Sequence, residues 1–140
     1  MPDRPVSVAG DGGGHDANAE DLFHERGDGG VKPTLLIGSR FDAYGAAQRL
    51  GCRLVVLDSQ PPSGRHRDLL AGHEQVDLRG ASETLVAAAR RACRGQVPAA
   101  VIAMTEAAVL PAAALREAIG VPGCRLETAR RCRDKRLMKR

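Results

Sequence analysis

Short apolar runs alternate with amphipathic stretches from residue 34 onward, and this alternation is the clearest pattern in the chain. Runs at 34–38, 54–57 and 99–104 are almost continuously apolar, and a short strand is also expected at 74–78, between the second and the third run. Continuous apolar runs of this length are typical of parallel strands that helices cover on both faces. The pattern therefore predicts four strands.

Helical spacing fills the segments between the predicted strands. Tyr44, Ala47 and Leu50 recur on one helical face. After the second run, a loop is expected at 65–67 and a single helical turn at 68–71, because proline and glycine turn chemistry precedes them. Each predicted strand is thus followed by a helical segment.

The segment 83–94 carries the most complete set of helix signals. Its apolar positions form one stripe, and Ser82 can cap its start. Glu83 lies in its first turn and Gly95 follows its last turn, as the helix dipole and the C-cap favour. A further helix is expected at 110–119.

This order of elements predicts an α/β fold with right-handed crossovers. We expect a small, Rossmann-like, three-layer domain over residues 33–125, with a parallel sheet of about four strands and helices on both faces. Residues 1–32 hold seven glycines and seven acids with no apolar periodicity. Such a segment buries too little surface to offset the entropy of ordering, so a disordered tail is predicted there.

The composition limits the kind of core, the cellular location and the metal chemistry that can be expected. Hydrophobic residues make up 43% of the chain and aromatic residues 2%, so the core must be built from aliphatic side chains. No stretch approaches the length of a membrane span, and we expect a cytoplasmic protein with no membrane partner. The four cysteines lack metal-ligand spacing, which predicts reduced, mostly buried thiols and no metal site.

Positive charge is concentrated at the C-terminus. The net charge is +4, yet residues 125–140 alone hold eight Lys or Arg against two acids. A nucleic-acid interface would spread cations over one face of the whole domain, so the composition disfavours nucleic acid as a partner. A homodimer is compatible with the sequence.

Candidate chemistry lies where the predicted strands end. In parallel sheets, ligands bind outside the carboxyl ends of the strands, which here are Gly38-Ser39-Arg40, Asp58-Ser59-Gln60 and Thr105-Glu106. Arg40 is the candidate for binding a substrate anion, whereas an isolated loop arginine is more often solvated. Glu106 either contacts substrate or stabilises the first turn of the next helix. No nucleophile, base and orienting acid occur together, so no catalytic residue is predicted.

Two features near the C-terminus carry a resemblance to a known family. A Gly-Val-Pro-Gly turn occupies 120–123, and Asp134-Lys135 follows about a dozen residues later. Together with the polar strand ends, this order resembles the N-terminal domain of ATP-grasp carboxylate–amine ligases. The resemblance covers residues from about 34 to 140.

The resemblance implies an activity that needs more than this chain. Family members activate a carboxylate as an acyl phosphate with ATP and Mg²⁺, and an amine then attacks it. Lys135 would approach the ATP phosphates, with Asp134 capping a new helix that places the lysine in its first turn. Residues 126–140 would begin the linker to an ATP-grasp region that the chain lacks. We therefore expect neither catalysis nor tight ATP binding by the 140 residues alone, and fraying of the C-terminal tail.

A second hypothesis belongs to a different class. A stand-alone α/β module that binds a small metabolite at the strand ends would show the same sheet without any catalysis. The gene sequence downstream of the codon for Arg140 separates the two hypotheses, because only a ligase needs a glycine-rich loop and metal-binding acid and amide residues.

Overall fold

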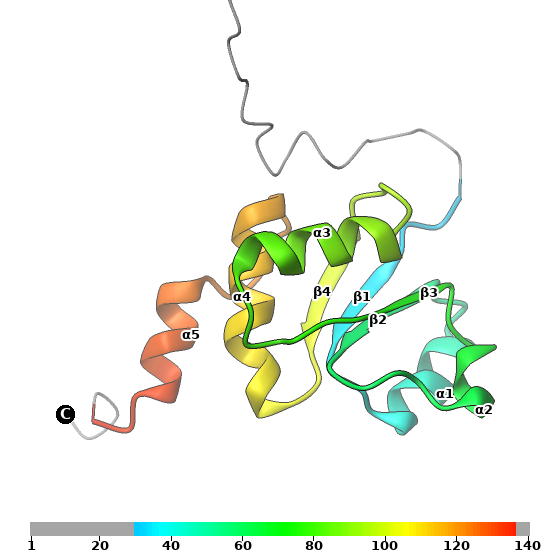
Figure 1. The fold of residues 1–140 in the computed structure, drawn as a ribbon, viewed down its shortest axis with the longest axis horizontal. Helices are drawn as coiled ribbons and strands as arrows, with labels where there is room; N and C mark the ends of the chain where they lie inside the picture. Colours follow the sequence, from blue (N-terminus) through cyan, green and yellow to red (C-terminus); the bar gives the residue numbers. More distant parts are fainter. Residues whose placement is uncertain (1–29, 137–140) are drawn as a thin grey trace, which may run out of the picture.

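The computed structural model describes residues 30–136 and shows one parallel sheet covered by helices (Figure 1). The sheet order is β3-β2-β1-β4, and every neighbouring pair is parallel. The predicted α/β class with four parallel strands is confirmed. The strands are β1 (Thr34–Ile37), β2 (Leu54–Asp58), β3 (Gly72–Gln75) and β4 (Ala100–Ala103).

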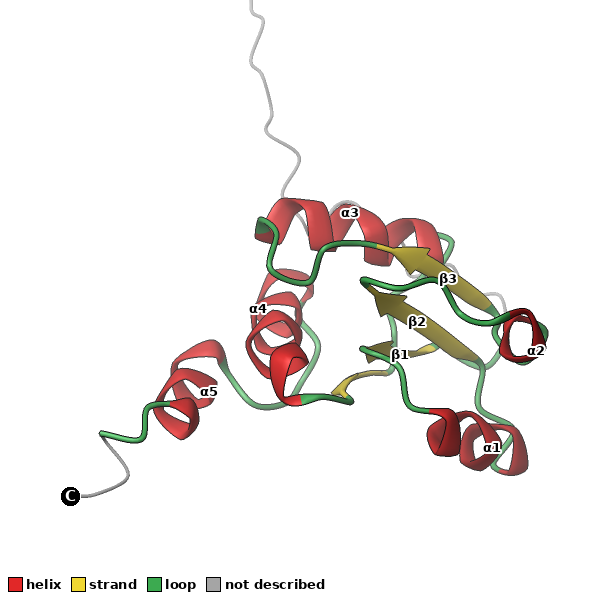
Figure 2. Ribbon diagram, turned by 60° about the horizontal axis from the view of Figure 1, so that its bottom comes forward, coloured by secondary structure: helices red, strands yellow, loops and turns green. Residues whose placement is uncertain are grey.

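Helices lie on both faces of the sheet (Figure 2). Two helices, α3 and α4, cover one face, while α1 covers the other and α5 packs against α4 (Figures 1 and 2). The helices are α1 (Phe41–Arg49), α2 (Gly64–Arg67), α3 (Ser82–Ala92), α4 (Val109–Ile119) and α5 (Leu126–Arg133), with a short 3-10 turn, η2 (Glu106–Ala108), before α4.

The pleat of the strands divides the core into two clusters. Leu35 and Ile37 point toward α3 and α4, whereas Leu36 between them points toward α1 and packs with Tyr44. Because β1 lies between β2 and β4, its apolar positions Leu35, Leu36 and Ile37 are all at most 3% exposed. The continuous apolar run in the sequence reflects this burial on both faces.

The region between β2 and α3 departs from the prediction. The helical turn lies at 64–67 instead of 68–71, and β3 begins at Gly72 and ends at Gln75, short of the predicted 74–78. Pairing of Val55 with Gly72 sets this register, and Val76 and Leu78 are buried beyond the ladder. A Cβ at Gly72 would overlap the Ala92 carbonyl oxygen, so glycine allows α3 to approach the strand.

One predicted helix cap is wrong, and a second is only partly described. Ser82 is the first residue of α3, Ala81 holds the N-cap position, and no side chain caps that start. Asp134 directly follows the last residue of α5, and a turn follows at 135–136. The Asp134 backbone is extended and its Oδ1 accepts the Arg136 N–H at 2.9 Å, which is the bond that a capping side chain makes, so its role as the cap of a new helix stays a prediction. Residues 137–140 lie outside the described part.

Two further predictions concern the cysteines and the N-terminal tail. All four thiols are free, but only Cys93 is buried, so the expectation of mostly buried cysteines is wrong. Burial raises the pKa of the Cys93 thiol to about 12, although the nearby Arg53 guanidinium lowers it by a smaller amount. Most of the tail predicted at 1–32 lies outside the described residues. Between residues 30 and 136, no helix is both long and apolar enough to cross a membrane.

Candidate functional site

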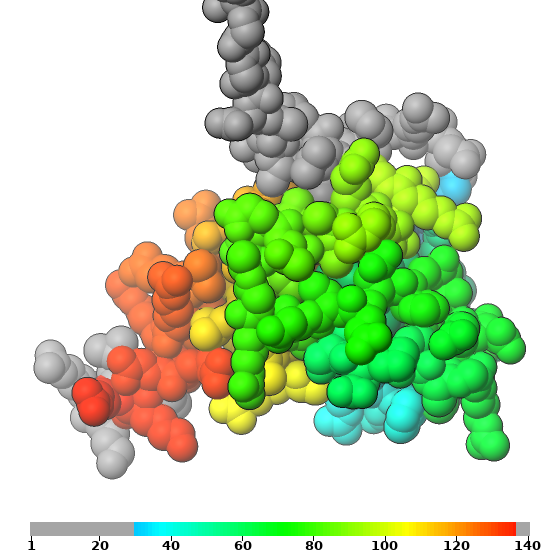
Figure 3. Space-filling view, viewed as in Figure 1, coloured from blue at the N-terminus to red at the C-terminus, as the bar shows by residue number. Residues whose placement is uncertain are grey.

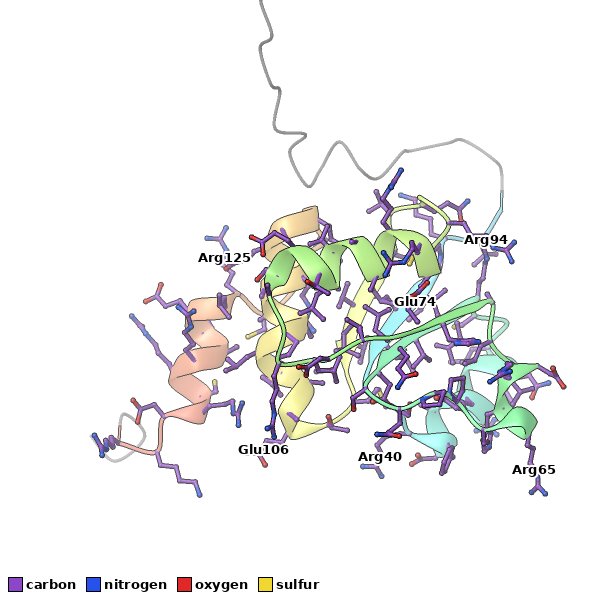
Figure 4. The ribbon with its side chains drawn as sticks, viewed as in Figure 1. Arg40, Arg65, Glu74, Arg94, Glu106 and Arg125 are labelled. Atoms are coloured by element: carbon purple, nitrogen blue, oxygen red, sulfur yellow. The ribbon has the colours of Figure 1, made fainter. Side chains whose placement is uncertain are left out.

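The carboxyl ends of the strands form one edge of the sheet, and Arg40 and Glu106 both lie along it (Figure 4). Arg40 follows β1 and Glu106 follows β4, the strand that pairs with β1. The structure therefore brings these two predicted residues to neighbouring strand ends. They carry opposite charges, which suits an edge that receives both an anionic and a cationic group.

The end of β1 touches the end of β4. Gly38 has a φ of +85°, and a Cβ there would lie 3.1 Å from Thr105 Oγ1. The Met104 N–H donates to the Ile37 carbonyl at 2.9 Å, which extends the pairing past the last ladder residue. Glycine is needed at 38 for both its backbone conformation and this close approach.

Arg40 occupies the N-cap position of α1 in an extended conformation. Its side chain is 57% exposed and forms an ion pair with Asp42 at 3.6 Å. An exposed pair of this length is weak, so the guanidinium can leave it for a bound carboxylate or phosphate at little cost.

Glu106 begins η2, with two residues between it and the end of β4, and is exposed. Its carboxylate makes no hydrogen bond or ion pair within residues 30–136. Its place before α4 agrees with stabilisation of a first helical turn, and its exposure also leaves it accessible to an ammonium group.

Asp58 at the end of β2 acts within the chain. Its Oδ1 accepts the Ser59 N–H at 2.7 Å, and Gln75 Nε2 donates to the Ser59 carbonyl at 3.1 Å. These bonds hold the turn after β2 against the end of β3. Asp58 is therefore a turn former, a role that short polar side chains commonly take at strand ends.

Lys135 lies in the turn that follows α5 and is exposed. It is two residues beyond the last residue of α5, Arg133, and most of the helix predicted to begin with it lies outside the described residues. Its place in the first turn of that helix stays a prediction.

The Gly-Val-Pro-Gly turn is held by a side chain that the sequence did not single out. Arg116 of α4 donates from Nε and Nη2 to the Val101 carbonyl, at 2.9 and 2.6 Å, and from Nη1 to the Cys124 carbonyl at 3.3 Å. Gly123 has a φ of +146°, and a Cβ there would lie 2.7 Å from Arg116 Cδ. Arg116 thus ties β4, the turn and the start of the C-terminal segment together.

Glu117 continues this arrangement. Its Oε1 accepts the Leu126 N–H at 3.0 Å, so a carboxylate from α4 caps the start of α5. The sequence signal for both residues is an Arg-Glu pair that two residues separate from a Gly-x-Pro-Gly turn. The pair fixes the direction in which the chain leaves the domain.

A cavity of about 360 Å³ lies between the loop after β3, the starts of α3 and α4, and α5. Arg79, Arg130 and Arg133 line it, and none of the three was predicted to be a site residue. Lys135 does not line it. Over residues 30–136, no group of three or more His, Cys, Asp or Glu side chains is placed to hold a metal ion.

Comparison with known proteins yields one structural similarity. No protein-family model matches the sequence, and no curated protein matches it significantly. The fold is similar to the crystal structure of phosphoribosylglycinamide synthetase from Anaerococcus prevotii, with a TM-score of 0.62 and 18% sequence identity. The match covers 79% of this chain and 28% of that chain. The chain therefore spans little more than a quarter of the synthetase, and at this identity the match shows a shared fold.

Proposed function

We propose that this chain is the N-terminal domain of an ATP-grasp ligase that joins a carboxylate to an amine through an acyl phosphate. The observation that carries the proposal is the fold match to phosphoribosylglycinamide synthetase, a synthetase of the ATP-grasp type, over 79% of the chain. The match agrees with the family resemblance of the Gly-Val-Pro-Gly turn and the Asp-Lys pair in the sequence.

The strand ends supply a reason for substrate binding. A guanidinium binds carboxylates and phosphates, and a carboxylate binds amines, so Arg40 and Glu106 suit the two substrate classes. Both side chains are exposed at neighbouring strand ends. In this proposal they position the substrates, and neither performs chemistry.

Lys135 is proposed to contact the ATP phosphates when an ATP-grasp region is present. Residues 30–136 offer no carboxylate group that fits Mg²⁺, so no metal ligand is assigned to them. ATP and Mg²⁺ would be held by the ATP-grasp region, and the chain alone would bind neither tightly. Phosphoryl transfer depends on charge neutralisation by several groups together, so the chain alone would be inactive. The free thiols support a reducing, cytoplasmic location.

The proposal is tested by measuring ADP release with a panel of carboxylates and amines. The 140-residue chain is compared with the product of the longest reading frame that contains it. We expect ADP release that depends on both substrates from the longer product and none from the chain alone. Arg40→Gln and Glu106→Gln in the longer product should raise KM with little change in kcat, because both residues act in substrate binding.

Two outcomes contradict the proposal. Ligation by the 140 residues alone would show that catalysis does not need an ATP-grasp region. A reading frame that ends at Arg140, with no remnant of an ATP-grasp sequence after it, would favour the second candidate. That candidate is a stand-alone module that binds a small metabolite, and the 360 Å³ cavity within the described residues favours it.

A further inference from the structure

We propose that the cavity between α3, α4 and α5 binds a small organic anion, with a phosphate or carboxylate at one end and an apolar body at the other. This inference does not depend on the ligase proposal, because the cavity is lined entirely by residues of this chain. Its volume of about 360 Å³ lies within the range of small-ligand sites.

Three arginines give the cavity its charge. Arg79 comes from the loop after β3, while Arg130 and Arg133 come from α5, and no acidic residue lines the cavity. Among the described residues, these three guanidinium groups make no ion pair or hydrogen bond. Like charges gathered at one cavity repel each other, and a bound anion would relieve this repulsion while accepting charge-assisted hydrogen bonds.

The position of the arginines on α5 is informative. Leu126, Arg130 and Arg133 follow helical spacing and line the same cavity, and Ala129 beside them is only 1% exposed. An amphipathic helix normally places apolar residues on the stripe that faces its neighbours. Arg130 and Arg133 occupy that stripe instead; both are exposed, and both line the cavity.

The start of α3 adds a second source of positive potential. Ser82 lines the cavity at the first position of this helix, and no side chain caps the helix start. The first N–H groups of a helix have no partners within the helix, and the macrodipole places partial positive charge there. Glu83, the acid in that first turn, does not line the cavity.

The remaining lining is apolar and decides the ligand class. Leu85 of α3, Leu110 of α4 and Leu126 of α5 contribute to it. In Figure 3 the green, yellow and orange-to-red parts of the chain that hold these elements lie next to one another on the left of the view. Inorganic phosphate would bind the arginines but leave this apolar surface exposed to water. An anion with an apolar body would satisfy both parts of the lining.

The test titrates the full chain with four probes and follows backbone amide signals by NMR. The probes are phenyl phosphate, benzoate, inorganic phosphate and benzyl alcohol, so that the anion and the apolar body are varied separately. We expect phenyl phosphate or benzoate to bind with the lowest Kd and to shift amides at 78–85 and 126–133. Inorganic phosphate should bind more weakly at the same amides, and benzyl alcohol should not bind.

Variants that each remove one positive charge distinguish binding at this cavity from a general attraction of anions to the basic C-terminal segment. Arg130→Gln and Arg133→Gln should each weaken binding about tenfold or more, as expected for loss of a hydrogen bond to a charged group. The matched control is Arg131→Gln on the same helix, which pairs with Glu127 outside the cavity and should change Kd by less than about twofold. Ala114→Leu should block binding by filling the cavity with no change in charge.

The outcomes decide between the explanations. Equal losses in Arg131→Gln and Arg133→Gln, or undiminished binding in Ala114→Leu, would overturn the site in favour of diffuse electrostatics. Shifts confined to other amides, or no binding to the native chain, would overturn it as well. Amide spectra of each unliganded variant show whether the fold is kept, and ADP release plays no part in the readout, so failure here is distinct from failure of the ligase proposal.

Discussion

The two faces of the sheet are covered to different depths. Among residues 30–136, eighteen buried residues form the cluster under α3 and α4, whereas four form the cluster under α1. The difference shows on β4, where Val101 faces the first cluster and is 3% exposed, while its neighbour Ile102 is 41% exposed. One face is thus a deep core that holds the domain together, and the other is a shallow cover over the two central strands.

Leu35 and Leu36 give the most direct test of this comparison, because they are adjacent on β1 and point to opposite faces. Leu35→Ala should lower the free energy of unfolding by about 4 kcal/mol and Leu36→Ala by about 2.5 kcal/mol. The cluster under α3 and α4 cannot relax to fill the cavity that the truncation leaves. On the other face, α1 can move toward the sheet and fill part of the cavity. Urea unfolding measures both values.

The control for this pair is Leu50→Ala at a side chain that is 79% exposed, where the change should stay within about 0.5 kcal/mol. Equal losses for Leu35→Ala and Leu36→Ala would remove the distinction between the faces.

Gly72 tests how closely α3 approaches the sheet on the deep face. Gly72→Ala should destabilise the protein by about 2 to 3 kcal/mol, because the new Cβ overlaps the Ala92 carbonyl oxygen and α3 must move away. Hydrogen exchange should show faster exchange of the α3 amides. Gly64→Ala is the matched control, since a Cβ there meets nothing within 4 Å, and it should cause no loss. Similar stability of the two variants would mean that α3 can shift freely.

Cys93 gives a pH dependence that belongs to the deep face. Burial raises the pKa of the folded-state thiol from 9.0 to about 12. The contribution of the buried neutral thiol to the free energy of unfolding is therefore complete below pH 9 and is lost as the pH rises toward 12. Between pH 8 and pH 10, the native protein should lose about 1 to 2 kcal/mol more unfolding free energy than Cys93→Ala. Parallel pH dependences of the two proteins would contradict this burial, and so would alkylation of Cys93 as fast as that of the exposed Cys52.

Elements with strong local signals were predicted correctly. The apolar runs of β1, β2 and β4 identify strands regardless of context. Burial on both faces leaves no polar positions in the interior of β1 or β2, and β4 is apolar as well although Ile102 is exposed. The segment from 64 to 75 was misplaced because its boundaries depend on pairing between β2 and β3 and on the space that Gly72 leaves for α3. The unequal cover of the two faces has no local signal either.

In the candidate site, too, the features with a local sequence signal were predicted and those that depend on tertiary packing were not. Arg40 and Glu106 were predicted at strand ends because parallel topology places all carboxyl ends at one edge. The arginine-lined cavity was not predicted, since Arg79 and Arg130 belong to separate elements that meet only through packing of α5 on α4. In the sequence, Arg130 and Arg133 are indistinguishable from the other cations of the C-terminal run.

Tyr44 gives the smallest expected effect, with opposite sign, on the shallow face. Its ring is 2% exposed, its hydroxyl is buried, and no hydrogen-bond partner for that hydroxyl occurs among the described residues. A buried hydroxyl without a partner loses its hydration for no gain, so Tyr44→Phe should raise the unfolding free energy by about 1 kcal/mol. Tyr44→Leu is the control, because it also removes the ring that contacts Phe41 and His66, and it should destabilise the protein. A loss of stability in Tyr44→Phe would mean that the hydroxyl has a hydrogen-bond partner. The buried polar groups of the shallow face would then be as fully hydrogen-bonded as those of the deep face.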